Sequence, residues 1–87
     1  MSLQNYTVTR VFSPEQLVPK HTLADVGEKE MQREFADWFR SAHFCKHEIN
    51  GWTVTVTVNT DESEAIAVAR VNQWLGNVPN ETMSAFA

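Results

Sequence analysis

The feature that most constrains the fold of this chain is the pair Asn50-Gly51, which separates two runs of residues with strand character. Asparagine and glycine both tolerate the positive φ angles that a two-residue type I′ turn needs at its central positions. The sequence therefore predicts a β-hairpin over residues 43–58 with Asn50-Gly51 as its loop. The cross-strand pairs expected in that register are Ile49 with Trp52, His47 with Val54, Cys45 with Val56 and His43 with Val58.

Valine and threonine alternate along the second strand of this hairpin, which indicates that its two faces meet different surroundings. The valines mark a buried face, and the threonines mark a face open to solvent. Cross-strand partners share a face, so both histidines and the cysteine of the first strand are expected on the valine side. The valine face is expected to hold Val54, Val56, Val58, Trp52, Ile49, His43, Cys45 and His47, and the open face Thr53, Thr55, Thr57, Phe44, Lys46 and Glu48.

The residues before the hairpin predict a strand, one helical turn and a longer helix. Residues 4–12 alternate as a strand does, and the capping-box pattern of residues 13–16 predicts a single helical turn that Pro19 ends. Apolar side chains then recur with helical spacing at Met31, Phe35, Trp38, Phe39 and Ala42. This stripe predicts a helix that begins at Thr22 or Asp25, each of which is followed by an acidic residue three positions later.

A second helix is predicted from Glu62 to Leu75. Acidic residues occupy its first turn, and Gly76, Asn77 and Pro79 follow its last apolar residue. Residues 77–87 have no period and are expected to form a C-terminal tail that docks through Met83 and Phe86.

The order of elements is strand, helix, strand, strand, helix, in one domain that spans residues 1–87. Each helix has one apolar stripe, and the hairpin has one valine face. The sequence therefore predicts an α+β fold. Its form is a two-layer α/β sandwich, in which a three-stranded sheet that contains the hairpin carries both helices on one face.

Composition limits the partners of the chain. Eleven acidic and seven basic residues give a net charge of −4, which disfavours binding to nucleic acid. No apolar run approaches the roughly 20 residues that cross a bilayer, so no membrane partner is expected. Cys45 is the single cysteine and no basic, apolar leader is present, so the expected location is the reducing cytoplasm.

His43, Cys45 and His47 are the one cluster of side chains suited to metal binding or nucleophilic catalysis. Alternate residues on a strand share a face about 6.5–7 Å apart, so the three side chains can converge on one ion. Structural zinc normally takes four ligands, however, and cysteine is also a common small filler of apolar cores. Phosphate-binding loops, paired-carboxylate motifs and nucleophile elbows are missing from the sequence. We therefore expect no enzyme activity, no cofactor and no bound metal.

The sequence favours a small acidic protein-interaction module: a regulator, inhibitor or accessory subunit that binds another protein, of the kind that compact bacterial genomes and mobile elements encode. A homodimer is a further form that this interaction can take. The candidate interface residues are Phe44, Thr53, Thr55, Thr57, Ile66 and Arg70.

Two alternative functions stay open at this point. The first is a ligand or metal sensor that uses His43, Cys45 and His47. The second is an acidic nucleic-acid mimic that occupies a basic groove. The mimic requires its acidic side chains to cluster on one surface, and the candidates are Glu28, Glu30, Glu34, Glu62 and Glu64.

Overall fold

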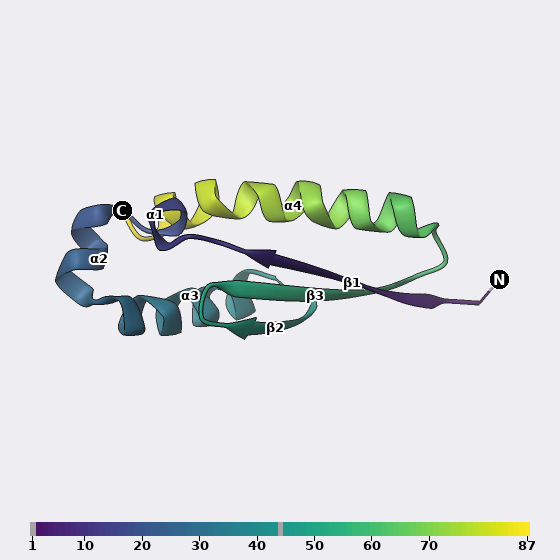
Figure 1. The fold of residues 1–87 in the computed structure, drawn as a ribbon, viewed down its shortest axis with the longest axis horizontal. Coiled ribbons are helices and arrows are strands. Elements are labelled where there is room, and N and C mark those ends of the chain that lie inside the picture. Colours follow the sequence, from purple (N-terminus) through teal and green to yellow (C-terminus); the bar gives the residue numbers. More distant parts are fainter. Residues whose placement is uncertain (1, 44) are drawn as a thin grey trace.

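The computed structural model describes residues 2–43 and 45–87 (Figure 1). These residues form a three-stranded antiparallel sheet and four helices, which confirms the predicted α+β fold. The strand order is β1-β3-β2, so β3 is the central strand. The elements are β1 (Gln4–Val11), α1 (Pro14–Leu17), α2 (Lys20–Val26), α3 (Glu28–Ala42), β2 (Lys46–Asn50), β3 (Thr53–Thr60) and α4 (Glu64–Ala85).

The molecule has two layers, and it is long and narrow, with extents of 51 × 18 × 18 Å. Both long helices lie on the valine face of the sheet, where the ring centroids of Phe39 from α3 and Trp74 from α4 are 5.6 Å apart. Val54 and Val56 are buried beneath them, whereas Lys46 and Glu48 on the opposite face are exposed. The two-layer sandwich with both helices on one face is therefore confirmed.

The hairpin forms, but its register differs by two residues from the predicted one. Asn50 pairs with Thr53, so the loop is Gly51-Trp52 and not Asn50-Gly51. Gly51 has a φ of 62°, and glycine at the first central position is what a type II′ turn requires. His47 therefore lies opposite Val56, and the expected pairs of Ile49 with Trp52, His47 with Val54 and Cys45 with Val56 are wrong.

The reason for this register lies in the side chain of Trp52. Within the turn, its Nε1 donates a hydrogen bond to Oε1 of Glu28 at 3.0 Å, and its ring lies 5.9 Å from that of Phe35. A shift of two residues keeps every side chain on its original face. The predicted division into a valine face and an open threonine face is therefore correct for the described residues of β2 and β3. His43 does not lie on a strand opposite Val58, because it caps the end of α3, and Phe44 lies outside the described residues.

The region before β2 contains one more helix than the sequence indicated. The predicted single turn is α1, where Oε1 of Gln16 accepts a hydrogen bond from the backbone N–H of Ser13 at 3.2 Å. α2 then begins directly after Pro19, and α3 begins after Gly27 rather than at Thr22 or Asp25. The φ of Gly27 is +97°, which interrupts the helix between the two.

α4 continues through both of its predicted stop signals, so the predicted end at Leu75 and the irregular tail 77–87 are wrong. Proline inside a helix costs about 3 kcal/mol, because it removes a backbone hydrogen bond and crowds the preceding turn. Beyond Pro79, however, the buried side chain of Thr82 donates hydrogen bonds to the carbonyls of Val78 and Pro79, each at 3.1 Å. Phe86 packs against the core at the end of α4, so this segment does dock as expected.

Candidate functional site

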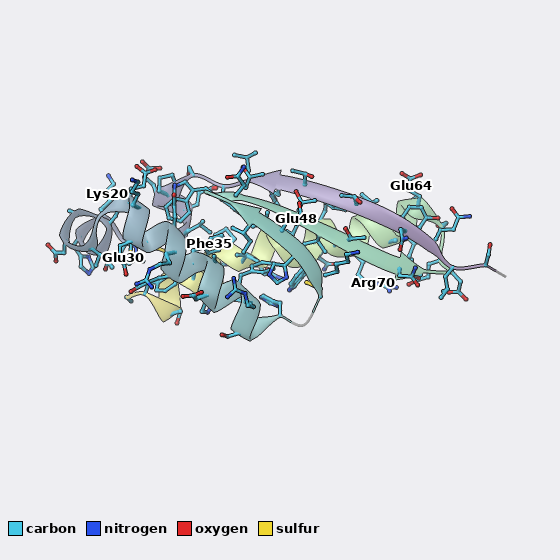
Figure 2. The ribbon with its side chains drawn as sticks, turned by 90° about the horizontal axis from the view of Figure 1, so that it is seen from below. Lys20, Glu30, Phe35, Glu48, Glu64 and Arg70 are labelled. Carbon is cyan, nitrogen blue, oxygen red and sulfur yellow. The ribbon has the colours of Figure 1, made fainter. Side chains whose placement is uncertain are left out.

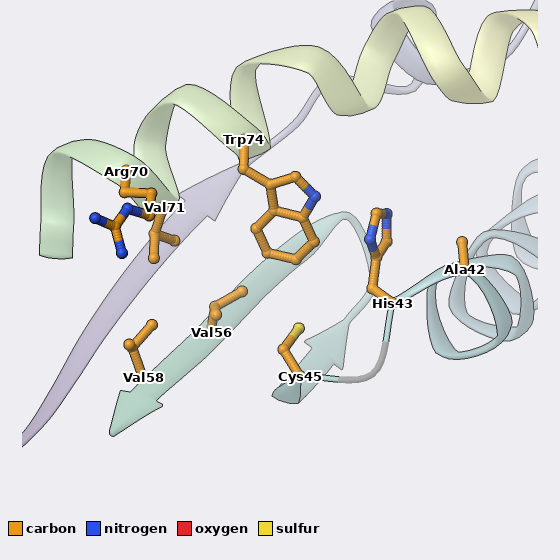
Figure 3. A pocket seen from close by; sticks show the side chains of 8 residues that line it. All are labelled: Ala42, His43, Cys45, Val56, Val58, Arg70, Val71 and Trp74. Carbon is orange, nitrogen blue, oxygen red and sulfur yellow. The ribbon is translucent and has the colours of Figure 1, made fainter. Parts of the chain in front are cut away.

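An open pocket of about 470 Å³ lies on the valine face, next to the end of α3 (Figure 3). Its volume falls within the range of roughly 300–1,000 Å³ that is typical of ligand sites. Figure 3 shows Val56 and Val58 on β3, Trp74 on α4 and Cys45 before β2. The lining residues are Ala42, His43, Cys45, Val56, Val58, Arg70, Val71 and Trp74.

The pocket exists because α3 is too short to cover the whole valine face. α3 ends at Ala42, and the phenylalanines that it buries lie over the turn end of β3. Val54 and Val56 are 0% and 1% exposed, whereas Val58, two residues further along the same strand, is only half-buried. The far end of the valine face is therefore partly open to solvent.

His43 stands at one wall of the pocket in an aromatic environment. Its ring centroid lies 4.9 Å from that of Phe39 and 4.5 Å from that of Trp74. Its Nε2 is buried and has no hydrogen-bond partner among the described residues; the nearest carboxylate oxygen, Oε2 of Glu81, is 3.6 Å away. Burial lowers the pKa of His43 and Glu81 opposes that shift, so the imidazole is neutral at pH 7.

Cys45 and His47 contact each other through the backbone rather than through the thiol. Nδ1 of His47 donates a hydrogen bond to the carbonyl oxygen of Cys45 at 2.8 Å. Burial raises the pKa of the Cys45 thiol, which disfavours the thiolate. The His47 ring packs against Phe39, with centroids 4.8 Å apart, and His47 is not among the residues that line the pocket.

The three side chains of the predicted metal cluster do not converge. Within residues 2–43 and 45–87, no three His, Cys, Asp or Glu side chains are grouped so that they can hold a metal ion. A metal sensor built on His43, Cys45 and His47 therefore lacks the geometry that it requires. What the structure does bring together is His43 and Cys45, as two walls of the apolar pocket.

The basic residue of the pocket lining is balanced by an acid. Arg70 makes a bidentate ion pair with Glu62, at 2.5 Å from Nη1 and 2.7 Å from Nη2. Ile66 is 53% exposed and lies one helical turn before Arg70, hence on the same side of α4. The edge of the pocket thus combines a neutralised guanidinium with an exposed apolar side chain.

The structure divides the predicted interface residues between two surfaces. Thr53, Thr55 and Thr57 are half-buried on the open face of the sheet, where the hydroxyls of Thr55 and Thr9 are 3.1 Å apart. Ile66 and Arg70 lie in the helical layer beside the pocket. Phe44 is outside the described residues. Sequence reasoning missed Val58 and Trp74 as site residues, because each belongs to a stripe that is otherwise buried.

The acidic side chains are spread along the molecule, as Figure 2 shows for Glu30 and Glu64 in its opposite halves. Three of the five candidates for a clustered acidic surface have partners: Glu28 accepts from Trp52, Glu30 pairs with Arg33, and Glu62 pairs with Arg70. The candidate acids thus fall into two groups, Glu28, Glu30 and Glu34 on α3 and Glu62 and Glu64 around the start of α4, a separation that does not favour an acidic nucleic-acid mimic.

No protein-family model, curated protein or solved structure matches this chain. Among the helices that the structure describes, none combines the length and apolar character needed to span a bilayer.

Proposed function

We propose that this chain is a non-enzymatic protein-interaction module of the cytoplasm, and that its pocket receives an apolar side chain of a partner protein. The observation that supports this proposal is the lining of the pocket. Val56, Val58, Val71 and Trp74 surround an open cavity large enough for one or two side chains. Apolar anchors that enter such cavities contribute most of the binding energy in many protein interfaces.

The charges around the pocket favour an apolar occupant. The guanidinium of Arg70 is already paired with Glu62, and burial keeps the His43 ring neutral. An ionic small molecule would therefore meet no unpaired charge among the described lining residues. The exposed side chain of Ile66 extends the apolar surface beyond the pocket itself, which suits a partner protein that covers more than the cavity.

A non-enzymatic role is supported by the state of the reactive side chains. A cysteine nucleophile needs a thiolate, and burial disfavours the thiolate of Cys45. The histidine closest in sequence on β2, His47, directs its Nδ1 to the carbonyl oxygen of Cys45 and not to the sulfur. This arrangement orients the imidazole without activating the thiol.

A sensor of a small apolar ligand is the second candidate, and one observation favours it. The Nε2 of His43 is buried without a hydrogen-bond partner among the described residues, and an unpaired polar group beside an apolar cavity can fix the orientation of a ligand. Such a ligand would remain bound during gentle purification and would appear as added mass in native mass spectrometry.

The test is capture of partners from a native lysate with three forms of the chain. Val58→Phe fills the pocket, and Thr57→Phe places the same ring one residue earlier on the opposite face. We expect the wild type and Thr57→Phe to retain one stoichiometric protein, and Val58→Phe to lose it. Loss with Thr57→Phe and retention with Val58→Phe would move the interface to the threonine face. A bound small molecule without a protein would favour the sensor.

A further inference from the structure

The two edges of the sheet differ in length and charge. β2 has five residues, and its exposed side chains include Lys46 and Glu48. β1 has eight residues with one charged side chain, Arg10, whose Nη1 donates a hydrogen bond to the carbonyl of Asn72 on α4 at 3.3 Å. Short, charged edges resist pairing with other strands, whereas long uncharged edges invite it. The β2 edge is therefore protected, and the β1 edge is not.

The outer backbone groups of β1 can be identified from its pairing with β3. The N–H of Phe12 donates to the carbonyl of Trp52 at 3.0 Å, so even-numbered residues of β1 direct their backbone groups to β3. The odd-numbered residues direct theirs outward, and no described strand pairs with them. Figure 2 shows β1 along the upper outline of the sheet. The outward residues are Asn5, Thr7, Thr9 and Val11.

Two exposed apolar side chains stand at the ends of this edge. Leu3 is 62% exposed and Val11 is 73% exposed, which makes them the most exposed large hydrophobic residues among those that the structure describes. Val11 pairs with Thr53 on the threonine side of the sheet, and the alternation of β1, continued by one residue, puts Leu3 on the same side. In a second copy of this strand that runs antiparallel to the first, the two residues come in reverse order, so Leu3 of each copy can lie opposite Val11 of the other.

We propose that β1 pairs antiparallel with β1 of a second copy of this chain, about a two-fold axis at Thr7. The result is one continuous sheet of six strands, three from each copy. Thr7 then lies opposite Thr7 of the second copy, and Leu3 lies opposite its Val11. A shift of two residues in either direction separates Leu3 from Val11. The sequence of the edge thus complements itself in one register, as a closed two-fold interface requires.

Charges do not oppose this pairing. β1 contains no acidic residue although the chain carries eleven, and in this register Arg10 lies opposite the neutral Gln4. One side of α4 carries a stripe of four exposed, uncharged residues at helical spacing, and Arg10 places two of them near this edge: its Nη1 donates to the carbonyl of Asn72, and a Cβ added at Gly76 would lie 3.5 Å from the same atom. The stripe consists of Ala65, Ala69, Asn72 and Gly76. The stripe carries no charge that would oppose the approach of α4 from the second copy.

The β1 edge and the pocket lie on different sides of α4, since Asn72 faces the edge whereas Arg70 and Trp74 face the pocket. The dimer therefore goes beyond the proposed function, and either proposal can fail without the other. Val58→Phe is expected to leave the dimer intact, and substitutions at Thr7 are expected to leave capture of the partner protein intact.

The dimer is tested by analytical ultracentrifugation of charge variants at the two-fold axis. Thr7→Lys and Thr7→Glu each place like charges directly opposite one another, so each variant is expected to sediment as a monomer at concentrations where the wild type is a dimer. An equimolar mixture places lysine opposite glutamate and is expected to recover the dimer, which also shows that both variants are folded. The control is Thr55→Lys, on the same face but in the central strand, and it stays dimeric.

Each contrary outcome overturns the proposal. A wild-type chain that sediments as a monomer from low micromolar to near-millimolar concentration rules out the dimer. Persistence of the dimer in both single variants places the contact elsewhere than β1. A mixture that does not associate contradicts the two-fold axis at Thr7. Capture of another protein's strand on this edge, in place of the second copy, also contradicts it.

Discussion

The two ends of the valine face have nearly the same sequence and different surroundings. At the closed end, formed by Trp52, Val54 and the overlying Phe35, each of the three side chains is buried. At the open end, formed by Val58 and the pocket, the same alternation of valine and threonine leaves the apolar side chain only half-buried. The difference is the covering layer, because α3 ends at Ala42 on the wall of the pocket and does not continue past it. Burial in this protein is thus decided by the length of a helix and not by the strand beneath it.

The largest expected effect comes from Phe35→Ala at the closed end. Phe35 is fully buried and packs against Phe12, Trp38, Phe39 and Trp52. Removing a buried phenylalanine ring leaves a cavity, so the free energy of unfolding should fall by about 3–5 kcal/mol. Urea denaturation followed by circular dichroism measures this loss. A loss below about 1 kcal/mol would show that the closed end is not the centre of the core.

The difference in burial between the closed and the open end is tested most directly by the same substitution at both ends of β3. Val54→Ala removes two carbons from a fully buried site and should lower the free energy of unfolding by about 2 kcal/mol. Val58→Ala removes them from the half-exposed wall of the pocket, so its cost should stay below about 1 kcal/mol. Equal urea midpoints for the two variants would mean that the open end is covered as well as the closed one.

Gly51→Val should have an intermediate effect, through the turn that carries Trp52 into the closed end. The φ of Gly51 is +62°. A residue with a Cβ atom is destabilised by about 1–2 kcal/mol at such a positive φ, and a β-branched residue such as valine is destabilised most. Thr55→Val, on the open face, should change stability by less than about 0.5 kcal/mol. The two variants are compared in one urea series, and a greater loss for Thr55→Val would show that the threonine face is covered.

The smallest effect concerns the pH dependence of stability at the open end. Burial lowers the pKa of His43 from its ordinary value of 6.5, with Glu81 opposing and His47 adding to the shift. The unfolded chain therefore binds a proton at higher pH than the folded chain, so stability falls as the pH drops below 6.5. His43→Phe should flatten this part of the stability profile, whereas His21→Phe, on exposed α2, should not. Parallel profiles for the wild type and His43→Phe would contradict the burial of His43.

Periodicity in the sequence predicted the faces of the sheet correctly, because the alternation of side chains is a local property of strand stereochemistry. It also located α3, whose buried Met31, Phe35 and Phe39 recur every four residues. Periodicity did not predict the register of the hairpin. Asn50-Gly51 is a strong local turn signal, yet the loop lies one residue further on, and in this register the indole of Trp52 reaches Glu28 on α3 and packs on Phe35.

The sequence by itself determined the two faces of the sheet and the apolar stripes of α3 and of the first part of α4, since these depend on neighbours along the chain. Only the tertiary structure decided where α4 ends, because Gly76 and Pro79 are local stop signals that the burial of Val78 and Thr82 outweighs. The tertiary structure also decided where the pocket lies. It depends on the reach of α3 relative to that of β3, and two elements that meet only in the folded chain carry no joint signal in the sequence.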